Sequence, residues 1–312
     1  MGRTAWIFPG QGSQYVGMGR DLCERYKEAC LTFEQAEAAL GMHLRRIIYE
    51  GPEETLKQTQ YAQPSIFVLS VALSRILFSM GFRPDLVAGH SLGEYSALVA
   101  GDAMGFEEAL GLVKNRALSM QAACEEKTGT MCAILGLDGP VMEEICSGIS
   151  EGIVDVANIN SHGQVVISGE PHAVRIASEE AKKHGAKRAV PLQVSGAFHS
   201  RLMRPAKEKF EPSVSSANIA RPEPGFFPNV SATLTQDPME IRNGLIEQIC
   251  SPVRWLSSVE KMLAEGADTF IEVGPGKVLT GLLKRIDGSA VGLNADLPES
   301  LETIARHFNG TK

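Results

Sequence analysis

A candidate nucleophile lies in the segment VAGHSLGEYS, residues 87–96. Residues 89–93, GHSLG, match the pattern G-x-S-x-G, which exposes a serine hydroxyl when it lies between a strand and a helix. The apolar residues 85–88 predict the strand, and the spacing of residues 92–100 predicts the helix. The pattern therefore predicts acyl-serine chemistry at Ser91. A serine that caps a helix beside turn glycines is the alternative.

A serine hydroxyl is a weak nucleophile at neutral pH and needs a general base. Among the seven histidines, His199 is the best candidate. It lies in the loop VSGAFHS, residues 194–200, which follows a predicted strand at a predicted domain junction. His90 adjoins Ser91 in the chain, but side chains of neighbouring residues diverge at such a turn. A structural role for His199 is the alternative.

A glycine-rich loop, FPGQGSQ at residues 8–14, follows the first predicted strand, residues 5–8. It lacks the third glycine of a dinucleotide-binding loop and the Gly-Lys pair of a phosphate-binding loop. Acyl transfer needs two backbone donors for the developing oxyanion. The N–H of Gln11 in this loop and the N–H of Leu92 after the serine are the candidates. A simple tight turn is the alternative for the loop.

Arg116 lies on an otherwise apolar face of the helix predicted for residues 106–124, one turn before Met120. Because a guanidinium cannot lose its proton in a protein, a buried one needs an anionic partner. That partner is either a structural Asp or Glu, or a substrate carboxylate held through two hydrogen bonds.

Composition limits the class of protein. The chain has 312 residues, with 44% hydrophobic and 21% charged residues, which is typical of a soluble globular protein. Its net charge of −7 argues against nucleic-acid binding.

The apolar run at residues 66–80 is short and interrupted by Arg75, which favours a buried helix over a membrane span. The six cysteines form no C-x-x-C pair, and the N-terminus lacks a signal core. We expect a cytoplasmic protein with reduced thiols, no metal site and no membrane partner.

The order of predicted elements indicates two parts. Strands alternate with helices at both ends of the chain, which predicts an α/β fold with a mostly parallel sheet. These include a helix at residues 21–40, and a strand at residues 270–273 followed by a helix at residues 277–285. The middle of the chain has the order β-α-β-β-α-β of a ferredoxin-like unit. Its elements are predicted at residues 130–137, 140–146, 154–158, 164–168, 171–184 and 188–194. We therefore predict an inserted domain at residues 127–195 within a larger domain, residues 1–126 and 196–312, and a ligand cleft between them.

Five motifs occur in an order typical of one family. They are FPGQGSQ (8–14), GHSLGE (89–94), Arg116 with Met120, AFHS (197–200) and IEVGPG (271–276). From about residue 5 to about residue 285, the chain resembles the malonyl-CoA:acyl carrier protein transacylases of bacterial type II fatty acid synthesis. It is similar also to the acyltransferase domains of polyketide synthases. The resemblance implies an α/β-hydrolase-like core with a ferredoxin-like insert, in agreement with the predicted organisation.

The resemblance also assigns roles to residues. It implies that Ser91 forms the malonyl ester, that His199 is the base, and that an oxygen of Gln248 orients the histidine in place of a carboxylate. It implies that the Gln11 and Leu92 amides bind the oxyanion and that Arg116 pairs with the free malonyl carboxylate. The further substrate-contact candidates are Met120, Phe198, Asn160 and His90. Of these, Phe198 would crowd the methyl of methylmalonyl, and His90 has a structural role as its alternative.

The implied reaction is a ping-pong transfer that uses no cofactor. The substrates are malonyl-CoA and the phosphopantetheine thiol of holo-acyl carrier protein. Because the carrier protein is acidic and this chain is acidic too, docking needs a local basic patch. The candidates are Lys182, Lys183, Lys187, Arg188, Arg201, Arg204 and Lys207. An ordinary solvated helix face is the alternative.

Three other functions remain open at the level of sequence. A serine hydrolase or thioesterase would have an acidic triad member, and the sequence offers no clear one. A catalytically silent carrier-binding scaffold would not need Ser91, His199 and Arg116 together. An acyltransferase of a polyketide pathway would use the same chemistry.

Overall fold

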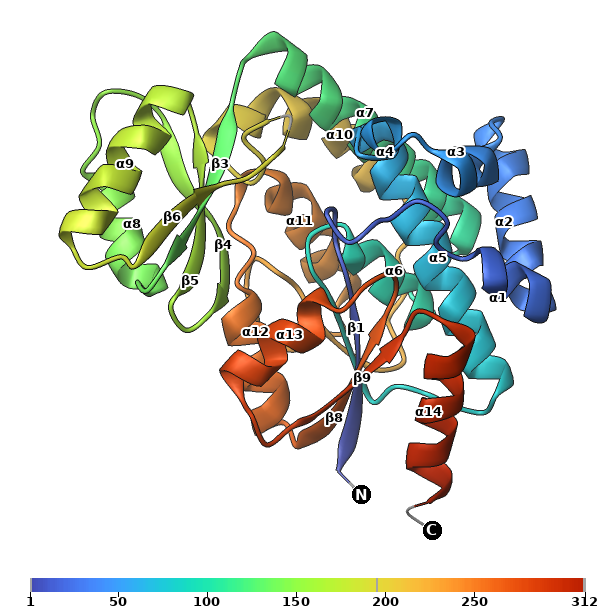
Figure 1. The fold of residues 1–312 in the computed structure, drawn as a ribbon. Coiled ribbons are helices and arrows are strands. Elements are labelled where there is room, and N and C mark those ends of the chain that lie inside the picture. The colour runs from blue at the N-terminus through green and yellow to red at the C-terminus, as the bar shows by residue number, and fades with distance from the viewer. Residues whose placement is uncertain (1, 195, 311–312) are drawn as a thin grey trace.

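The computed structural model describes residues 2–194 and 196–310. Within these residues the strands form two sheets (Figure 1): a five-stranded parallel sheet in the order β7-β2-β1-β8-β9, and a four-stranded antiparallel sheet in the order β4-β5-β3-β6. The strands of the parallel sheet are β1 (Arg3–Phe8), β2 (Leu86–Gly89), β7 (Gly225–Phe227), β8 (Ala267–Val273) and β9 (Val291–Ala295). The prediction of an α/β fold with a mostly parallel sheet is confirmed.

The register of the central strands decides where the motifs meet. Strand β1 lies between β2 and β8, and its Phe8 is paired with Gly89 at the end of β2. Because the strands are parallel, the loops that follow them leave from the same edge of the sheet. The loop with Gln11 therefore lies next to the turn with Ser91.

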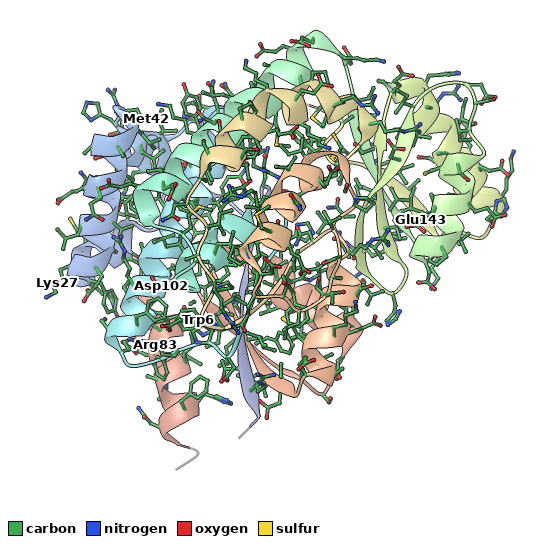
Figure 2. All side chains as sticks on the ribbon, turned by 180° about the vertical axis from the view of Figure 1, so that it is seen from behind. Trp6, Lys27, Met42, Arg83, Asp102 and Glu143 are labelled. Carbon is green, nitrogen blue, oxygen red and sulfur yellow. The ribbon has the colours of Figure 1, made fainter. Side chains whose placement is uncertain are left out.

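Helices surround the parallel sheet (Figure 1). Those before the small sheet are α1 (Arg20–Arg25), α2 (Lys27–Leu40), α3 (Leu44–Glu50), α4 (Glu53–Leu56), α5 (Thr59–Ser79), α6 (Gly93–Ala100) and α7 (Phe106–Glu126). Those after it are η1 (Arg201–Met203), α10 (Arg204–Ser216), α11 (Pro238–Glu247), η2 (Gln248–Cys250), α12 (Trp255–Ala264), α13 (Val278–Ile286) and α14 (Pro298–Asn309). Trp6 of β1 is fully buried, and Figure 2 shows Lys27 and Glu143 on opposite sides of the molecule.

The prediction of one continuous helix at residues 21–40 is wrong. It is divided at Tyr26, whose backbone is extended with φ −126° and ψ 117°, so that α1 ends and α2 begins there. Neither glycine nor proline marks this position, and the periodicity of apolar residues continues across it. The break therefore has no signal in the local pattern.

Helix α5 is, within the described chain, the one segment long and apolar enough to cross a membrane by length and composition. Its most apolar window has a mean hydropathy of 1.4, but 83% of that window is buried inside the protein. The helix begins at Thr59, well before the predicted residue 66, and packs against α2 and α7. The prediction of a buried core helix is confirmed.

The small sheet and its helices are inserted between α7 and η1. The elements are β3 (Thr130–Leu135), α8 (Gly139–Ser147), β4 (Val154–Ser161), β5 (Gln164–Gly169), α9 (Pro171–Lys183) and β6 (Arg188–Pro191). Helices α8 and α9 cover the face of this sheet that points away from the parallel sheet (Figure 1). The ferredoxin-like order is confirmed. The boundaries at residues 127 and 195 stay a prediction, and residue 195, like residues 1 and 312 at the ends of the larger domain, lies outside the described residues.

Backbone hydrogen bonds join the two parts at β4. The Ile159 N–H donates to the Val253 carbonyl at 2.9 Å, and the Val253 N–H donates to the Ala157 carbonyl at 2.8 Å. This short parallel bridge fixes the small sheet against the large part.

Candidate active site

Ser91 lies at a strained turn between β2 and α6. Its φ of 53° is in the left-handed region, which costs free energy for a residue with a β-carbon and is found mainly at functional sites. The turn is tight, because a β-carbon placed on Gly89 would lie 1.8 Å from the Gly93 carbonyl carbon. The following helix directs its positive end at the serine. The G-x-S-x-G pattern thus forms the predicted strand–turn–helix.

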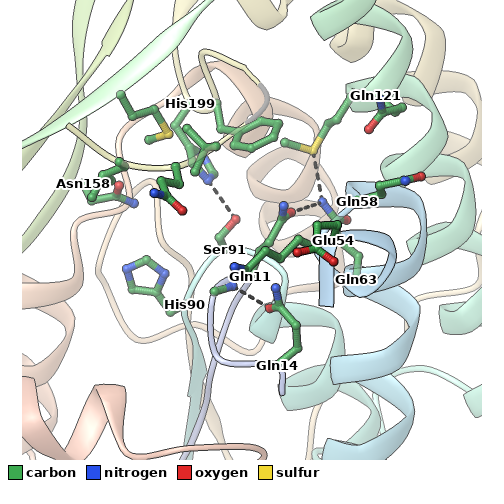
Figure 3. Close-up of a pocket in the computed structure, with 18 of the residues that line it drawn as sticks. Gln11, Gln14, Glu54, Gln58, Gln63, His90, Ser91, Gln121, Asn158 and His199 are labelled. Carbon is green, nitrogen blue, oxygen red and sulfur yellow. Dashed lines mark hydrogen bonds between the residues drawn. The ribbon is translucent and has the colours of Figure 1, made fainter. Parts of the chain in front are cut away.

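Ser91 and His199 form a hydrogen-bonded pair (Figure 3). Ser91 Oγ lies 2.8 Å from His199 Nε2, and His199 Nδ1 lies 2.9 Å from the backbone carbonyl oxygen of Gln248. Because a carbonyl can only accept, Nδ1 carries the ring proton. Nε2 is then the acceptor, and the serine hydroxyl donates to it. No carboxylate among the described residues contacts this histidine.

His199 is neutral at physiological pH. It is buried and, like Ser91, has a positive φ. Burial, followed by the charge of Arg116, lowers the pKa of His199 from its ordinary 6.5 to about 3. A neutral imidazole beside a serine hydroxyl can take the hydroxyl proton.

This pKa predicts the pH dependence of Ser91 reactivity. The protonated imidazole cannot accept a proton, so reactivity is lost as pH falls through the pKa of His199. Since that pKa is depressed, inactivation by a neutral sulfonyl fluoride should keep a constant rate from pH 8 to below about pH 5. Arg116→Gln removes one of the causes that lower the pKa of His199. The reactivity of Ser91 in this variant should therefore be lost at a higher pH than in the wild type. A wild-type midpoint near pH 6.5 would contradict this description of the site.

Arg116 contacts the hydroxyl of Ser91 and is fully buried. Its guanidinium donates to Gln63 Oε1 at 2.8 Å, to Gln248 Oε1 at 2.8 Å and to Ser91 Oγ at 3.0 Å. All three acceptors are neutral. Within the described residues Arg116 makes no direct ion pair with an Asp or Glu, and the nearby carboxyl group of Glu94 acts on its pKa without contacting it. A buried cation without a contacting anion favours binding of a negatively charged group.

The Gln11 loop packs directly on the serine turn. A β-carbon placed on Gly10 would lie 2.5 Å from the His90 carbonyl oxygen, so the two backbones are in close contact. Among the described residues, the N–H groups of Gln11 and Leu92 donate to no protein acceptor. Both amides are therefore available to an oxyanion beside Ser91.

A cavity of about 530 Å³ opens over the pair and lies between the two parts of the protein. Its wall includes, among the predicted residues, Gln11, His90, Ser91, Met120, Phe198 and His199 (Figure 3). Met120 is also joined to Arg116 through Gln63, whose Nε2 lies 3.6 Å from the Met120 sulfur. The helix face predicted for these two residues therefore borders the site.

Asn160 does not line this cavity, whereas Asn158, two residues earlier on β4, does. The Asn160 side chain is occupied, because its Oδ1 accepts a hydrogen bond from His90 Nε2 at 2.9 Å. The His90 ring also packs against Trp255, with ring centroids 5.6 Å apart. Substrate contact at Asn160 and His90 stays a prediction, and the structure shows a contact between the two residues.

Three residues that support the site are not among those predicted from the sequence. Gln63 accepts from Arg116, the Asn229 side chain accepts from the Ser91 N–H at 2.7 Å, and buried Glu94 accepts from both Asn229 and Gln248. Glu94 belongs to the motif GHSLGE, and a carboxylate on a short helix of otherwise apolar and small residues was the available signal. Gln63 and Asn229 come from distant segments without a recognisable pattern.

Residues 5–292 match the family of acyl transferase domains. A curated relative, the malonyl CoA-acyl carrier protein transacylase of Bacillus subtilis, is 43% identical over 304 residues, which are 97% of this chain and 96% of that protein. This chain belongs to the acyl transferase family. The family resemblance seen in the motifs is confirmed.

Solved structures extend the acyl transferase fold over nearly the whole chain. An acyl carrier protein S-malonyltransferase from Vibrio cholerae has a TM-score of 0.93 at 42% identity, covering 97% of this chain and 99% of that one. A malonyl-transacylase in complex with its type II PKS acyl-carrier protein has a TM-score of 0.93 at 40% identity, covering 96% of this chain and 98% of that one. The α/β-hydrolase-like core with its ferredoxin-like insert is therefore the family fold.

Proposed function

We propose that this chain transfers the malonyl group from malonyl-CoA to the phosphopantetheine thiol of holo-acyl carrier protein, in the cytoplasm, through a malonyl ester of Ser91. The observation that carries the proposal is the buried Arg116 guanidinium, 3.0 Å from Ser91 Oγ and without a carboxylate partner among the described residues. It supports binding of an acyl group that ends in a free carboxylate.

The first half-reaction forms the ester. The malonyl carboxylate pairs with Arg116, which directs the thioester carbonyl toward Ser91. His199 Nε2 takes the hydroxyl proton as Ser91 Oγ bonds to the carbonyl carbon, and the Gln11 and Leu92 amides bind the oxyanion. The carbon–sulfur bond then breaks, and CoA leaves as a thiol with the proton from His199.

The second half-reaction reverses these steps with another thiol. The phosphopantetheine thiol gives its proton to His199 as its sulfur bonds to the ester carbon. Ser91 Oγ leaves and recovers the proton from His199. No electron transfer is involved, so the residues described above suffice for the proton and acyl movements.

The orienting group of the base favours transfer over hydrolysis. In place of an acidic triad member, His199 donates to the Gln248 carbonyl. A neutral acceptor stabilises the imidazolium less than a carboxylate does, and a thiol needs less help from a base than water because it is more acidic. This supports a transferase rather than the hydrolase or thioesterase alternative.

Three further parts of the proposal concern selectivity and pathway. Phe198, on the cavity wall, would crowd the methyl of methylmalonyl, a preference of about 1–3 kcal/mol. The predicted insert would supply one wall of the cleft, since Met131, Asn158 and Leu192 line the cavity. Similarity along nearly the whole chain to the Bacillus subtilis transacylase supports a role in fatty acid synthesis over a polyketide pathway.

The fate of the acyl group tests the proposal. The protein is incubated with radiolabelled malonyl-CoA, with and without holo-acyl carrier protein. We expect a covalent label on the protein that moves to the carrier. Steady release of malonate regardless of the carrier would identify a hydrolase, and a protein that never becomes labelled would identify a scaffold.

Only some of the cations in the predicted docking patch are unpaired in the structure. Three of its cations are paired, namely Lys183 with Glu180, Arg201 with Asp155 and Lys207 with Glu247. The other four, Lys182, Lys187, Arg188 and Arg204, are exposed and make no ion pair within the described residues. They support a proposed docking surface for an acidic carrier protein.

Charge reversal tests this surface. Arg188→Glu and Arg204→Glu should each raise KM for holo-acyl carrier protein by about 3- to 10-fold and weaken its dependence on salt, because unpaired rim charges act mainly on association. Malonyl-enzyme formation from malonyl-CoA should not change. Lys183→Glu, at a cation already paired, is the matched control. An unchanged carrier KM in both variants would exclude these two positions.

A further inference from the structure

Glu94 is a buried carboxylate that the mechanism above does not use. It lies on α6, three residues after Ser91, and is 1% exposed. One of its oxygens accepts the backbone N–H of Asn229, and the other accepts the side-chain amide of Gln248. It makes no hydrogen bond to Ser91 Oγ or to His199 within the described residues. Within the described residues, its side-chain hydrogen bonds therefore reach the site through Asn229 and Gln248.

Gln248 contacts three parts of the proposed site. Its carbonyl oxygen accepts from His199 Nδ1, and its side-chain Oε1 accepts from Arg116 at 2.8 Å. Its Nε2 donates to the Ser91 carbonyl at 2.9 Å and to the carboxylate of Glu94. One residue thus joins the histidine, the arginine and the serine turn.

Asn229 is the second residue held by Glu94. Its Oδ1 accepts the Ser91 N–H at 2.7 Å, and its Nδ2 donates to the Gly89 carbonyl at 2.6 Å. These two bonds brace the strained serine turn on both sides. Glu94 holds the backbone of this residue in place, so both sides of the turn depend on it.

We propose that Glu94 is a positioning residue for acyl-group selection: it orients the Gln248 amide so that Oε1 faces Arg116, and so holds the guanidinium ready for the substrate carboxylate. This inference rests on the proposed function. In the structure both oxygens of Glu94 accept hydrogen bonds, so the group of Gln248 that faces Glu94 is the amide nitrogen. The amide oxygen is then left for Arg116. The reverse orientation would place the amide NH₂ against the guanidinium, which is also only a donor.

The same series of contacts places the carboxyl group of Glu94 near Arg116 without direct contact between the two side chains. The links run from Arg116 to Gln248 Oε1 and from Gln248 Nε2 to Glu94. A carboxylate in direct contact with the guanidinium would compete with the substrate, whereas one beyond an intervening amide does not. Burial raises the pKa of Glu94 to about 8, and the Asn229 N–H, Arg116 and Gln248 act against that rise.

Glu94→Gln tests the proposal with little change in shape. The new side chain has one acceptor oxygen. If that oxygen keeps the Asn229 N–H, its NH₂ faces the Gln248 NH₂, and the amide of Gln248 must turn. We expect malonyl-enzyme formation from malonyl-CoA to slow by about 10- to 100-fold, the effect of one lost hydrogen bond to a charged group. Acetyl-enzyme formation should change by less than about threefold, because no substrate charge is involved.

Glu272→Gln is the matched control. Glu272 is also fully buried and accepts the backbone N–H groups of Leu279 at 3.0 Å and Thr280 at 2.8 Å, at the start of α13. Its replacement should lower the thermal unfolding temperature but leave the malonyl-to-acetyl ratio unchanged. Rates are expressed per serine that reacts with a fluorophosphonate probe, so that unfolded protein does not count.

The readout is the ratio of malonyl to acetyl rates. A fall of about tenfold or more in Glu94→Gln, absent in Glu272→Gln, supports the proposal. An unchanged ratio overturns it, even if stability falls. If Glu94→Gln does not fold, Glu94→Asp, which keeps both acceptors on a shorter arm, must show a reduced ratio for the proposal to stand. A wild-type protein that forms no malonyl ester contradicts the proposed function instead.

Discussion

Replacing Arg116 with alanine is expected to lower kcat/KM for malonyl-CoA by roughly 100- to 3,000-fold, while kcat/KM for acetyl-CoA stays within about tenfold of its wild-type value. Removing one member of a buried ion pair costs about 3–5 kcal/mol, and each 1.4 kcal/mol is about tenfold in rate. The acetyl group has no carboxylate to pair with Arg116. The variant therefore loses, in its reaction with acetyl-CoA, only the effect of Arg116 on the surroundings of Ser91. The preference between the two acyl groups should therefore largely disappear.

The side chain of Arg116 also supports the core, so a second variant is needed. Arg116→Lys keeps the charge but cannot form the fork that meets Gln63, Gln248 and Ser91 together. It should recover part of the malonyl preference. Circular dichroism and thermal unfolding establish that both variants are folded. Equal losses for malonyl-CoA and acetyl-CoA would show that Arg116 has a structural role only.

Replacing Ser91 with alanine is expected to abolish the covalent intermediate and to lower malonyl transfer by at least about 10⁴-fold, because no other group takes over a nucleophile's role in such a pair. Positioning by Arg116 and the oxyanion donors cannot substitute for the missing bond. The measurement is the incorporation of label from malonyl-CoA into protein, followed by its transfer to holo-acyl carrier protein.

Ser96→Ala is the matched control for this variant. Ser96 is fully buried on the same helix, α6, and its hydroxyl has no hydrogen-bond partner within the described residues. The same hydroxyl is removed a few residues away from the turn, so labelling should remain close to wild type. Persistent labelling of Ser91→Ala would place the nucleophile elsewhere.

Much of the site could be predicted because its motifs are local. The turn at Ser91 depends on glycines that lie within five residues of one another, and the Gln11 loop follows a strand that pairs in parallel with β2. His199 was found by its unusual loop. Arg116 was found because a charge on an apolar helix face conflicts with burial. Each of these features has a physical reason that can be read from neighbouring residues.

The remaining features depend on contacts between distant segments. Gln248 orients His199 through its backbone carbonyl, which any residue possesses, so its type alone carries no signal for that contact. Its side chain and that of Gln63 stand in place of the acid expected around a buried cation, and the side chain of Asn229 binds the serine turn. Amides at these positions become meaningful only when the fold brings them together. The division of the first long helix at Tyr26 likewise lacks a local cause.

A competition experiment measures whether the serine ester forms selectively with an acyl group that bears a free carboxylate. The protein is mixed briefly with equal concentrations of malonyl-CoA and acetyl-CoA, quenched in acid, digested and examined by mass spectrometry. We expect the peptide containing Ser91 to carry the malonyl group almost exclusively. Comparable amounts of acetyl and malonyl on that peptide, or malonyl on another residue, would contradict it.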